Sequence, residues 1–115
     1  MSEDKLTVDR SGDYAVIHTR GYINNVGGEE IADSAYRLMD DGVRTLLLDL
    51  RETKIVNSIG ISILIEIVEK MMERDGKVAF CCLTPVIRKT FQIMGLAQYA
   101  TIYENEEEAR TELSQ

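Results

Sequence analysis

The sequence has few of the residues that mark zinc sites, disulfide-stapled folds and interdomain linkers. Its 115 residues include one histidine, two cysteines, one proline and no tryptophan. One histidine and one adjacent cysteine pair do not supply the separated ligand pairs of a structural zinc site. A single proline and eight glycines, with no serine-, glycine- or proline-rich stretch, indicate no internal linker. We therefore expect residues 1–115 to form one domain.

Clusters of positive charge and long apolar runs are also missing. The chain carries 20 Asp and Glu against 13 Lys and Arg, which leaves a net charge of −7. Binding to nucleic acid or to an anionic membrane needs clustered positive charge, so we expect neither as a direct partner. No apolar stretch reaches the roughly 18 residues of a membrane span, and charges occupy residues 1–10, where a signal peptide would be apolar. These features predict a cytoplasmic protein.

The two cysteines, Cys81 and Cys82, are adjacent within an apolar run. Successive side chains of a strand point to opposite faces, so a bond between these two sulfur atoms is not expected. The pattern predicts two buried free thiols in a reducing compartment.

Apolar patterning predicts strands that alternate with helices. Alternating or continuous apolar runs predict strands at residues 6–8, 14–20, 45–50, 77–83 and 100–103. Apolar residues at helical spacing predict helices around residues 31–39, 58–74, 85–95 and 105–113. The order β-β-α-β-α-β-α-β-α predicts an α/β fold, a mostly parallel mixed sheet of about five strands with about four helices.

Residues 58–74 fit two templates, because isoleucine occupies every second position from Ile59 to Ile67. Their length, and a polar face that includes Glu66 and Lys70 at helical spacing, favour a helix over a strand. The stripe formed by Ile63, Leu64, Ile67, Val68, Met71 and Met72 is expected to face the core.

Residues that support catalysis are sparse. His18 has no serine or cysteine partner that the sequence places beside it, so a structural, hydrogen-bonded role is expected. The glycines form no phosphate-binding pattern, and Asp49 lacks the acidic pair that a phosphoacceptor aspartate needs to hold magnesium. An enzyme would have only His18, Asp49 and Cys81 to use. We therefore expect a binding protein without catalytic activity or cofactor.

Ser58 stands at the junction of the predicted loop 53–60 and the long predicted helix 58–74. A serine at this place has a structural use, because its hydroxyl can accept a hydrogen bond from a free N–H group of the first turn. The same place suits a phosphate, which the exposed N–H groups and the helix dipole stabilise. The residue pattern alone leaves both roles open.

The run of residues 46–50, followed by Ile55-Val56-Asn57-Ser58-Ile59-Gly60-Ile61, resembles the signature of the STAS domain of stand-alone bacterial anti-sigma factor antagonists. The resemblance extends over residues 6–113 and includes Gly21 and the helix 85–95. It implies a single STAS domain that binds an anti-sigma factor with serine kinase activity. Phosphorylation of Ser58 would inactivate the protein, and a PP2C-type phosphatase would restore it. The implied partner-binding residues are Asn24, Asn25, Asn57, Ile59, Gly60, Ile61 and Ser62.

Some positions depart from the family pattern. Asn57 stands where an aspartate usually precedes the phosphorylated serine, and Asn24 stands where the loop motif usually ends in aspartate. Ile59 replaces a small residue; it either packs under the loop or is an exposed partner contact, and we favour the exposed contact. These changes keep a second function open, a STAS module that does not switch sigma factors. It would act as a stressosome-like scaffold, or as a regulatory subunit that binds another protein or a nucleotide.

Overall fold

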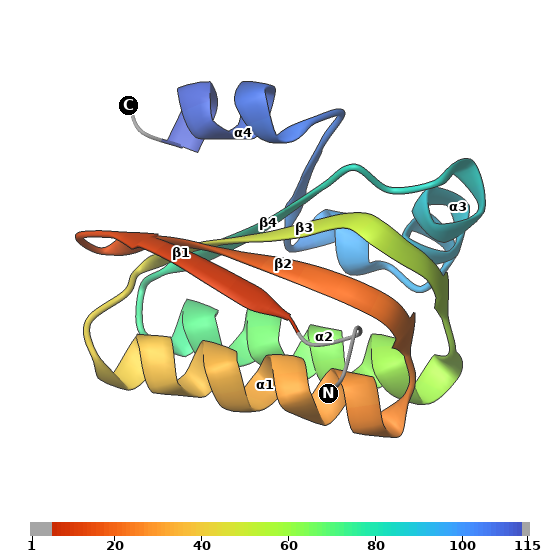
Figure 1. Ribbon diagram of the computed structural model, residues 1–115, viewed down its shortest axis with the longest axis horizontal. Coiled ribbons are helices and arrows are strands. Elements are labelled where there is room, and N and C mark those ends of the chain that lie inside the picture. The colour runs from red at the N-terminus through yellow and green to blue at the C-terminus, as the bar shows by residue number, and fades with distance from the viewer. Residues whose placement is uncertain (1–5, 114–115) are drawn as a thin grey trace.

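The computed structural model describes residues 6–113 (Figure 1). Across these residues one five-stranded sheet has the spatial order β1-β2-β3-β4-β5. The strands are β1 Thr7–Ser11, β2 Tyr14–Ile23, β3 Thr45–Val56, β4 Lys77–Cys81 and β5 Thr101–Tyr103. β1 is antiparallel to β2, and every other neighbouring pair is parallel. The predicted mixed sheet and element order are confirmed.

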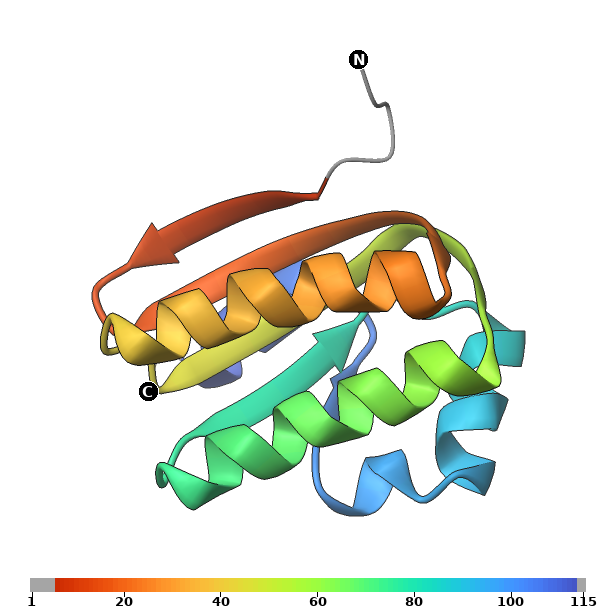
Figure 2. The same ribbon diagram turned by 90° about the horizontal axis from the view of Figure 1, so that it is seen from below.

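The helices form layers on both faces of the sheet. They are α1 Asn25–Asp40, α2 Ser58–Glu73, α3 Pro85–Ile93 and α4 Glu106–Leu113, with a 3₁₀ turn at Leu96–Gln98. α1 and α2 lie side by side across one face, and α4 lies against the other (Figures 1 and 2). Within residues 6–113, no helix combines the length and the apolar character that crossing a bilayer would need.

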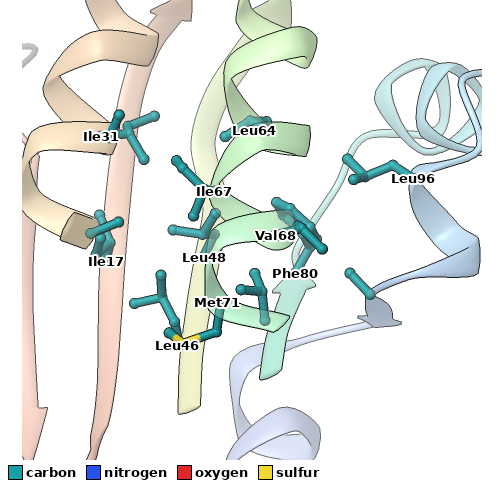
Figure 3. Packing of buried hydrophobic residues seen from close by; sticks show 14 of the residues in the cluster. Ile17, Ile31, Leu46, Leu48, Leu64, Ile67, Val68, Met71, Phe80 and Leu96 are labelled. Atoms are coloured by element: carbon teal, nitrogen blue, oxygen red, sulfur yellow. The ribbon is translucent and has the colours of Figure 1, made fainter. Parts of the chain in front are cut away.

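The main core lies between the sheet and the layer of α1 and α2 (Figure 3). Alternation along β3 sends Leu46 and Leu48 into this core and Leu47 to the face under α4. α2 is a helix, as its length predicted, with a buried stripe of Leu64, Ile67, Val68 and Met71. Met72 was predicted to belong to this stripe, but 49% of its surface is exposed, whereas the preceding Met71 is buried.

Several predicted element boundaries were wrong. β2 continues to Ile23 instead of residue 20, and β3 continues to Val56 instead of residue 50. The two extensions pair with each other through two register shifts, so each supplies the backbone hydrogen bonds that the other needs. α1 begins at Asn25, several residues before the predicted start at residue 31. The strand ends are set by pairing between β2 and β3, which the local apolar pattern does not reveal.

The two cysteines are free thiols, as predicted, but their geometry differs from the prediction. Cys81 ends β4 and is buried, whereas Cys82 is only partly buried. β4 stops at Cys81, and the backbone of Cys82 turns to a φ of 65°. The two sulfur atoms therefore lie 3.6 Å apart instead of on opposite faces of the sheet.

Candidate functional site

Two similar junctions between a strand and a helix form one end of the molecule. β2 leads into α1 through Asn24, whose Oδ1 accepts a hydrogen bond from the N–H of Gly27 at 2.9 Å. β3 leads into α2 through Asn57, whose Oδ1 accepts from the N–H of Gly60 at 2.8 Å. The first turns of both helices lack acidic side chains. Two positive helix ends with neutral caps therefore lie at the same end of the sheet (Figure 1).

The two junctions are in direct contact. The backbone N–H of Asn57 donates to the carbonyl oxygen of Ile23 at 3.1 Å. A Cβ atom at Gly60 would lie only 2.2 Å from that same oxygen, and one at Gly28 would lie 2.8 Å from Cδ1 of Ile63. The absence of a side chain at Gly60 lets the first turn of α2 pack on the end of β2. The position of Ser58 is thereby tied to the end of the sheet.

Ser58 is the first residue of α2 and is exposed. The capping side chain belongs to Asn57, so the interpretation of Ser58 as the cap is wrong. The helix begins one residue earlier than it would with Ser58 as the cap, because the amide oxygen of Asn57 accepts the hydrogen bond from Gly60. One turn onward, the exposed Ser62 donates from its Oγ to the carbonyl oxygen of Ser58 at 3.1 Å. The hydroxyl of Ser58 has no part in capping.

Exposed apolar side chains accompany Ser58 at this end. Ile59 is 55% exposed, as predicted. Tyr22 and Ile55, which are paired in the register of β2 and β3, are 46% and 56% exposed. Val26, in the first turn of α1, is 61% exposed. We call Tyr22, Val26, Ile55 and Ile59 the apolar rim; such exposed side chains are suited to contact a protein partner.

The other predicted partner-binding residues differ in exposure. Asn25 is exposed and Asn24 is half-buried, both at the start of α1. Gly60 is buried, and Ile61 is only 1% exposed. These two residues shape the site from beneath, so any effect on a partner would pass through the residues that they support.

Sequence reasoning missed three of the four residues of the apolar rim. Tyr22 and Ile55 belong to the strand extensions that only the pairing of β2 with β3 reveals. A signal was present for Val26, since an isolated valine lies between two asparagines and two glycines. An apolar residue outside the buried periodicity of its helix is a candidate surface contact.

A polar cluster lies away from this end, beneath α4. His18 Nε2 lies 2.9 Å from Glu106 Oε1 and 3.8 Å from Asp49 Oδ2. The hydrogen-bonded histidine that the sequence predicted is confirmed. The sequence did not associate Glu106 with it, because 88 residues separate the two.

Comparisons with known proteins agree with this architecture. The model of the STAS domain family matches residues 5–109. The chain is 24% identical over 105 residues to the Bordetella bronchiseptica protein "Putative anti-sigma factor antagonist BtrV", covering 91% of this chain and 90% of that protein. An anti-sigma factor antagonist from Mycobacterium paratuberculosis superimposes with a TM-score of 0.83 at 22% identity, covering 99% of this chain and 98% of that one. The Bacillus cell fate determinant SpoIIAA in its phosphorylated form gives 0.76 at 19% identity, covering 94% and 98%. These structures share the fold of this chain.

Proposed function

The chain belongs to the STAS domain family, and from this we propose that it is an anti-sigma factor antagonist controlled by reversible phosphorylation of Ser58. The name of the Bordetella relative and the phosphorylated state of the Bacillus protein support this function. One observation carries the choice of residue. Ser58 is exposed at the first position of α2 while Asn57 provides the cap, so its modification removes no capping hydrogen bond.

The local electrostatics favour a phosphate on Ser58 without refolding. A phosphoserine carries a charge of about −1.5 to −2 at neutral pH. The positive end of α2 stabilises this charge, and no acidic side chain in the first turn opposes it. The same charge lies beside the exposed Ile59, and burying it against an apolar partner surface is costly. Phosphorylation would therefore weaken docking while it leaves the domain folded.

The partner that fits this surface is an anti-sigma factor with serine kinase activity. It would dock on the apolar rim and place Ser58 in its own active site, and it would bring ATP and magnesium. A PP2C-type phosphatase would return Ser58 to the hydroxyl form. The chain itself acts as the bound protein and catalyses no reaction. Because Asn24 and Asn57 are neutral, the partner must recognise two amides where the family pattern has two carboxylates.

Phosphorylation by an anti-sigma factor with serine kinase activity tests the proposal. The full chain is incubated with that kinase and ATP, and phosphopeptides are located by mass spectrometry. We expect one phosphate on Ser58, none on Ser58→Ala, and normal labelling of Ser62→Ala, the exposed serine one turn away. Equal labelling of the wild type and Ser58→Ala would contradict the assignment.

Binding of the unmodified and phosphorylated chains to the same kinase measures the consequence. We expect isothermal titration to show tight binding of the unmodified chain and a loss of at least about tenfold after phosphorylation. Equal affinities would instead favour the STAS module that does not switch partners.

A further inference from the structure

Three adjacent strands place chemically active side chains in one row. The register pairs His18 of β2 with Asp49 of β3, and Asp49 with Cys81 of β4. α4 covers this face of the sheet, and its first residue, Glu106, extends toward the row. Oε1 of Glu106 lies 2.9 Å from Nε2 of His18. An imidazole and two carboxylates from three separate elements therefore meet beneath the start of α4.

The spacing of these three groups suits a metal ion. His18 Nε2 lies 3.8 Å from Asp49 Oδ2, and one donor atom from each of the three residues lies within 4.8 Å of the others. With bonds of about 2.1 Å, neighbouring ligands lie about 3.0 Å apart in an octahedral site and about 3.4 Å apart in a tetrahedral one. We propose that His18 Nε2, Asp49 Oδ2 and Glu106 Oε1 bind a divalent transition-metal ion, with Zn²⁺ as the representative ion.

The second oxygen of each carboxylate is held by another partner. Oδ1 of Asp49 accepts from the backbone N–H of Arg51 at 2.9 Å. Oε2 of Glu106 accepts from Nε of Arg110 at 2.6 Å. These contacts orient the remaining oxygens toward the imidazole, which is the role that outer hydrogen bonds have in metal sites.

A bound cation would compensate the negative charges of the cluster. Asp49 is 2% exposed, and its burial beside Glu106 raises the pKa of its carboxyl group. A buried carboxylate next to another requires either a proton or a positive ion. When Nε2 binds the ion, the imidazole proton resides on Nδ1, which lies 4.0 Å from Oδ2 of Asp9.

A cavity beside the cluster gives access and space for water. Its volume is about 340 Å³, and its lining contains four carboxylates and two guanidinium groups, so acidic groups predominate. The residues around it are Thr7, Asp9, His18, Thr19, Arg20, Asp49, Arg51, Glu52 and Glu106. Three protein ligands with an open side leave coordination positions for water.

The donor set distinguishes among possible ions and ligands. An imidazole nitrogen favours transition metals, whereas Mg²⁺ prefers oxygen ligands alone. The thiols of Cys81 and Cys82 also lie near Asp49. Burial raises the pKa of both thiols, so an ion that bound to them would have to displace a thiol proton. The site is therefore assigned to nitrogen and oxygen donors.

Titration of the untagged full chain with Zn²⁺ tests the site directly. We expect isothermal titration to give one ion per chain, with affinity reduced at least about tenfold in Asp49→Asn and in Glu106→Gln. Glu107→Gln, at the next position of α4, removes the same charge from an exposed side chain and should bind like the wild type. Absence of binding by the folded wild type, or equal binding by all variants, overturns the proposal.

Two further measurements control for misfolded variants and identify the ligand atoms. Circular dichroism in the presence of a chelator checks that each variant is folded. If Asp49→Asn does not fold, the comparison relies on Glu106→Gln. Co²⁺ provides a spectroscopic probe, for which we expect the weak visible bands of nitrogen and oxygen ligands. A strong thiolate charge-transfer band would place the ion at the cysteines and overturn the assignment. None of these results depends on the phosphorylation of Ser58.

Discussion

The backbone N–H of Asn57 donates a hydrogen bond to the carbonyl oxygen of Ile23, 3.1 Å away. This contact joins the start of α2 to the end of β2, two segments that are distant in the sequence. The same carbonyl oxygen is the atom that a side chain at Gly60 would strike. The proposed phosphorylation site is therefore held by backbone contacts, and substitutions around it have separable effects on stability and on binding.

Replacement of Gly60 by alanine should destabilise the domain. The new Cβ would lie 2.2 Å from a backbone oxygen, which cannot move as a flexible side chain can. We expect the free energy of unfolding in urea to fall by about 1 to 3 kcal/mol, the usual cost of overpacking. Ser62→Ala, an exposed change in the same helix, is the control and should stay within about 0.5 kcal/mol of the wild type. Equal stability of both variants would contradict the close approach.

Replacement of Asn57 separates its capping role from its missing charge. Asn57→Ala removes the acceptor of the Gly60 N–H, and we expect a loss of about 1 kcal/mol in urea unfolding. Asn57→Asp keeps the acceptor and adds a negative charge at the helix start, so stability should be equal or higher by about 0.3 to 1 kcal/mol. Asn24→Ala tests the corresponding cap of α1 and should behave like Asn57→Ala. If Ser58→Ala loses more free energy of unfolding than Asn57→Ala, Ser58 and not Asn57 would be the cap.

Ser58→Asp should weaken the capture of the partner without destabilising the fold. A carboxylate at the first position of α2 suits the helix dipole, so the melting temperature should be unchanged or slightly higher. Affinity for the anti-sigma factor, measured by isothermal titration, should fall because the charge adjoins the apolar rim. Ser58→Asn is the neutral control of similar size and should bind more tightly than Ser58→Asp. A large loss of stability in Ser58→Asp would reveal a structural need for the hydroxyl.

The contact between α1 and α2 should weaken at high pH, when Tyr36 ionises. Its hydroxyl donates to Oε1 of Glu66 at 3.0 Å. Burial, followed by this hydrogen bond, raises the pKa of Tyr36 to about 12. Because the folded pKa lies above the ordinary value of about 10, the stabilisation is complete below pH 10 and is lost as the pH rises through 12.

Absorbance of tyrosinate during a pH titration measures this effect. We expect the component that ionises near pH 12 to vanish in Tyr36→Phe and to move to lower pH in Glu66→Gln, which removes the charge of the acceptor. An unchanged titration curve in Tyr36→Phe would show that another tyrosine is responsible.

The secondary structure followed closely from local patterns. The stripe of Leu64, Ile67, Val68 and Met71 predicted α2, and the apolar run of residues 46–50 predicted the buried half of β3. Helical spacing predicted a helix around residues 85–95, and α3 begins at Pro85, where Oγ1 of Thr84 accepts from the N–H of Ile87 at 3.2 Å. Such signals are local, since each depends on residues within about one helical turn or on strand alternation.

The sequence placed Ser58 at a helix start but could not decide which residue caps the helix. Asparagine and serine are comparable caps, so the choice depends on where the chain leaves β3. That point is set by the pairing of β3 with β2 up to Val56, and the polar segment between residues 51 and 54 gave no local sign of it. The exposure of Tyr22 and Ile55 depends on the same pairing.

Local chemistry thus determined the order of the elements, the apolar faces that pack together, and the placement of a serine at the start of the second long helix. The tertiary structure decided which distant groups meet. It brought the N–H of Asn57 to Ile23 and brought Glu106 to His18 and Asp49. The physical reason is that the packing of the whole core fixes the strand register and the docking of α4. Helix and strand periodicity, in contrast, depends only on neighbouring residues.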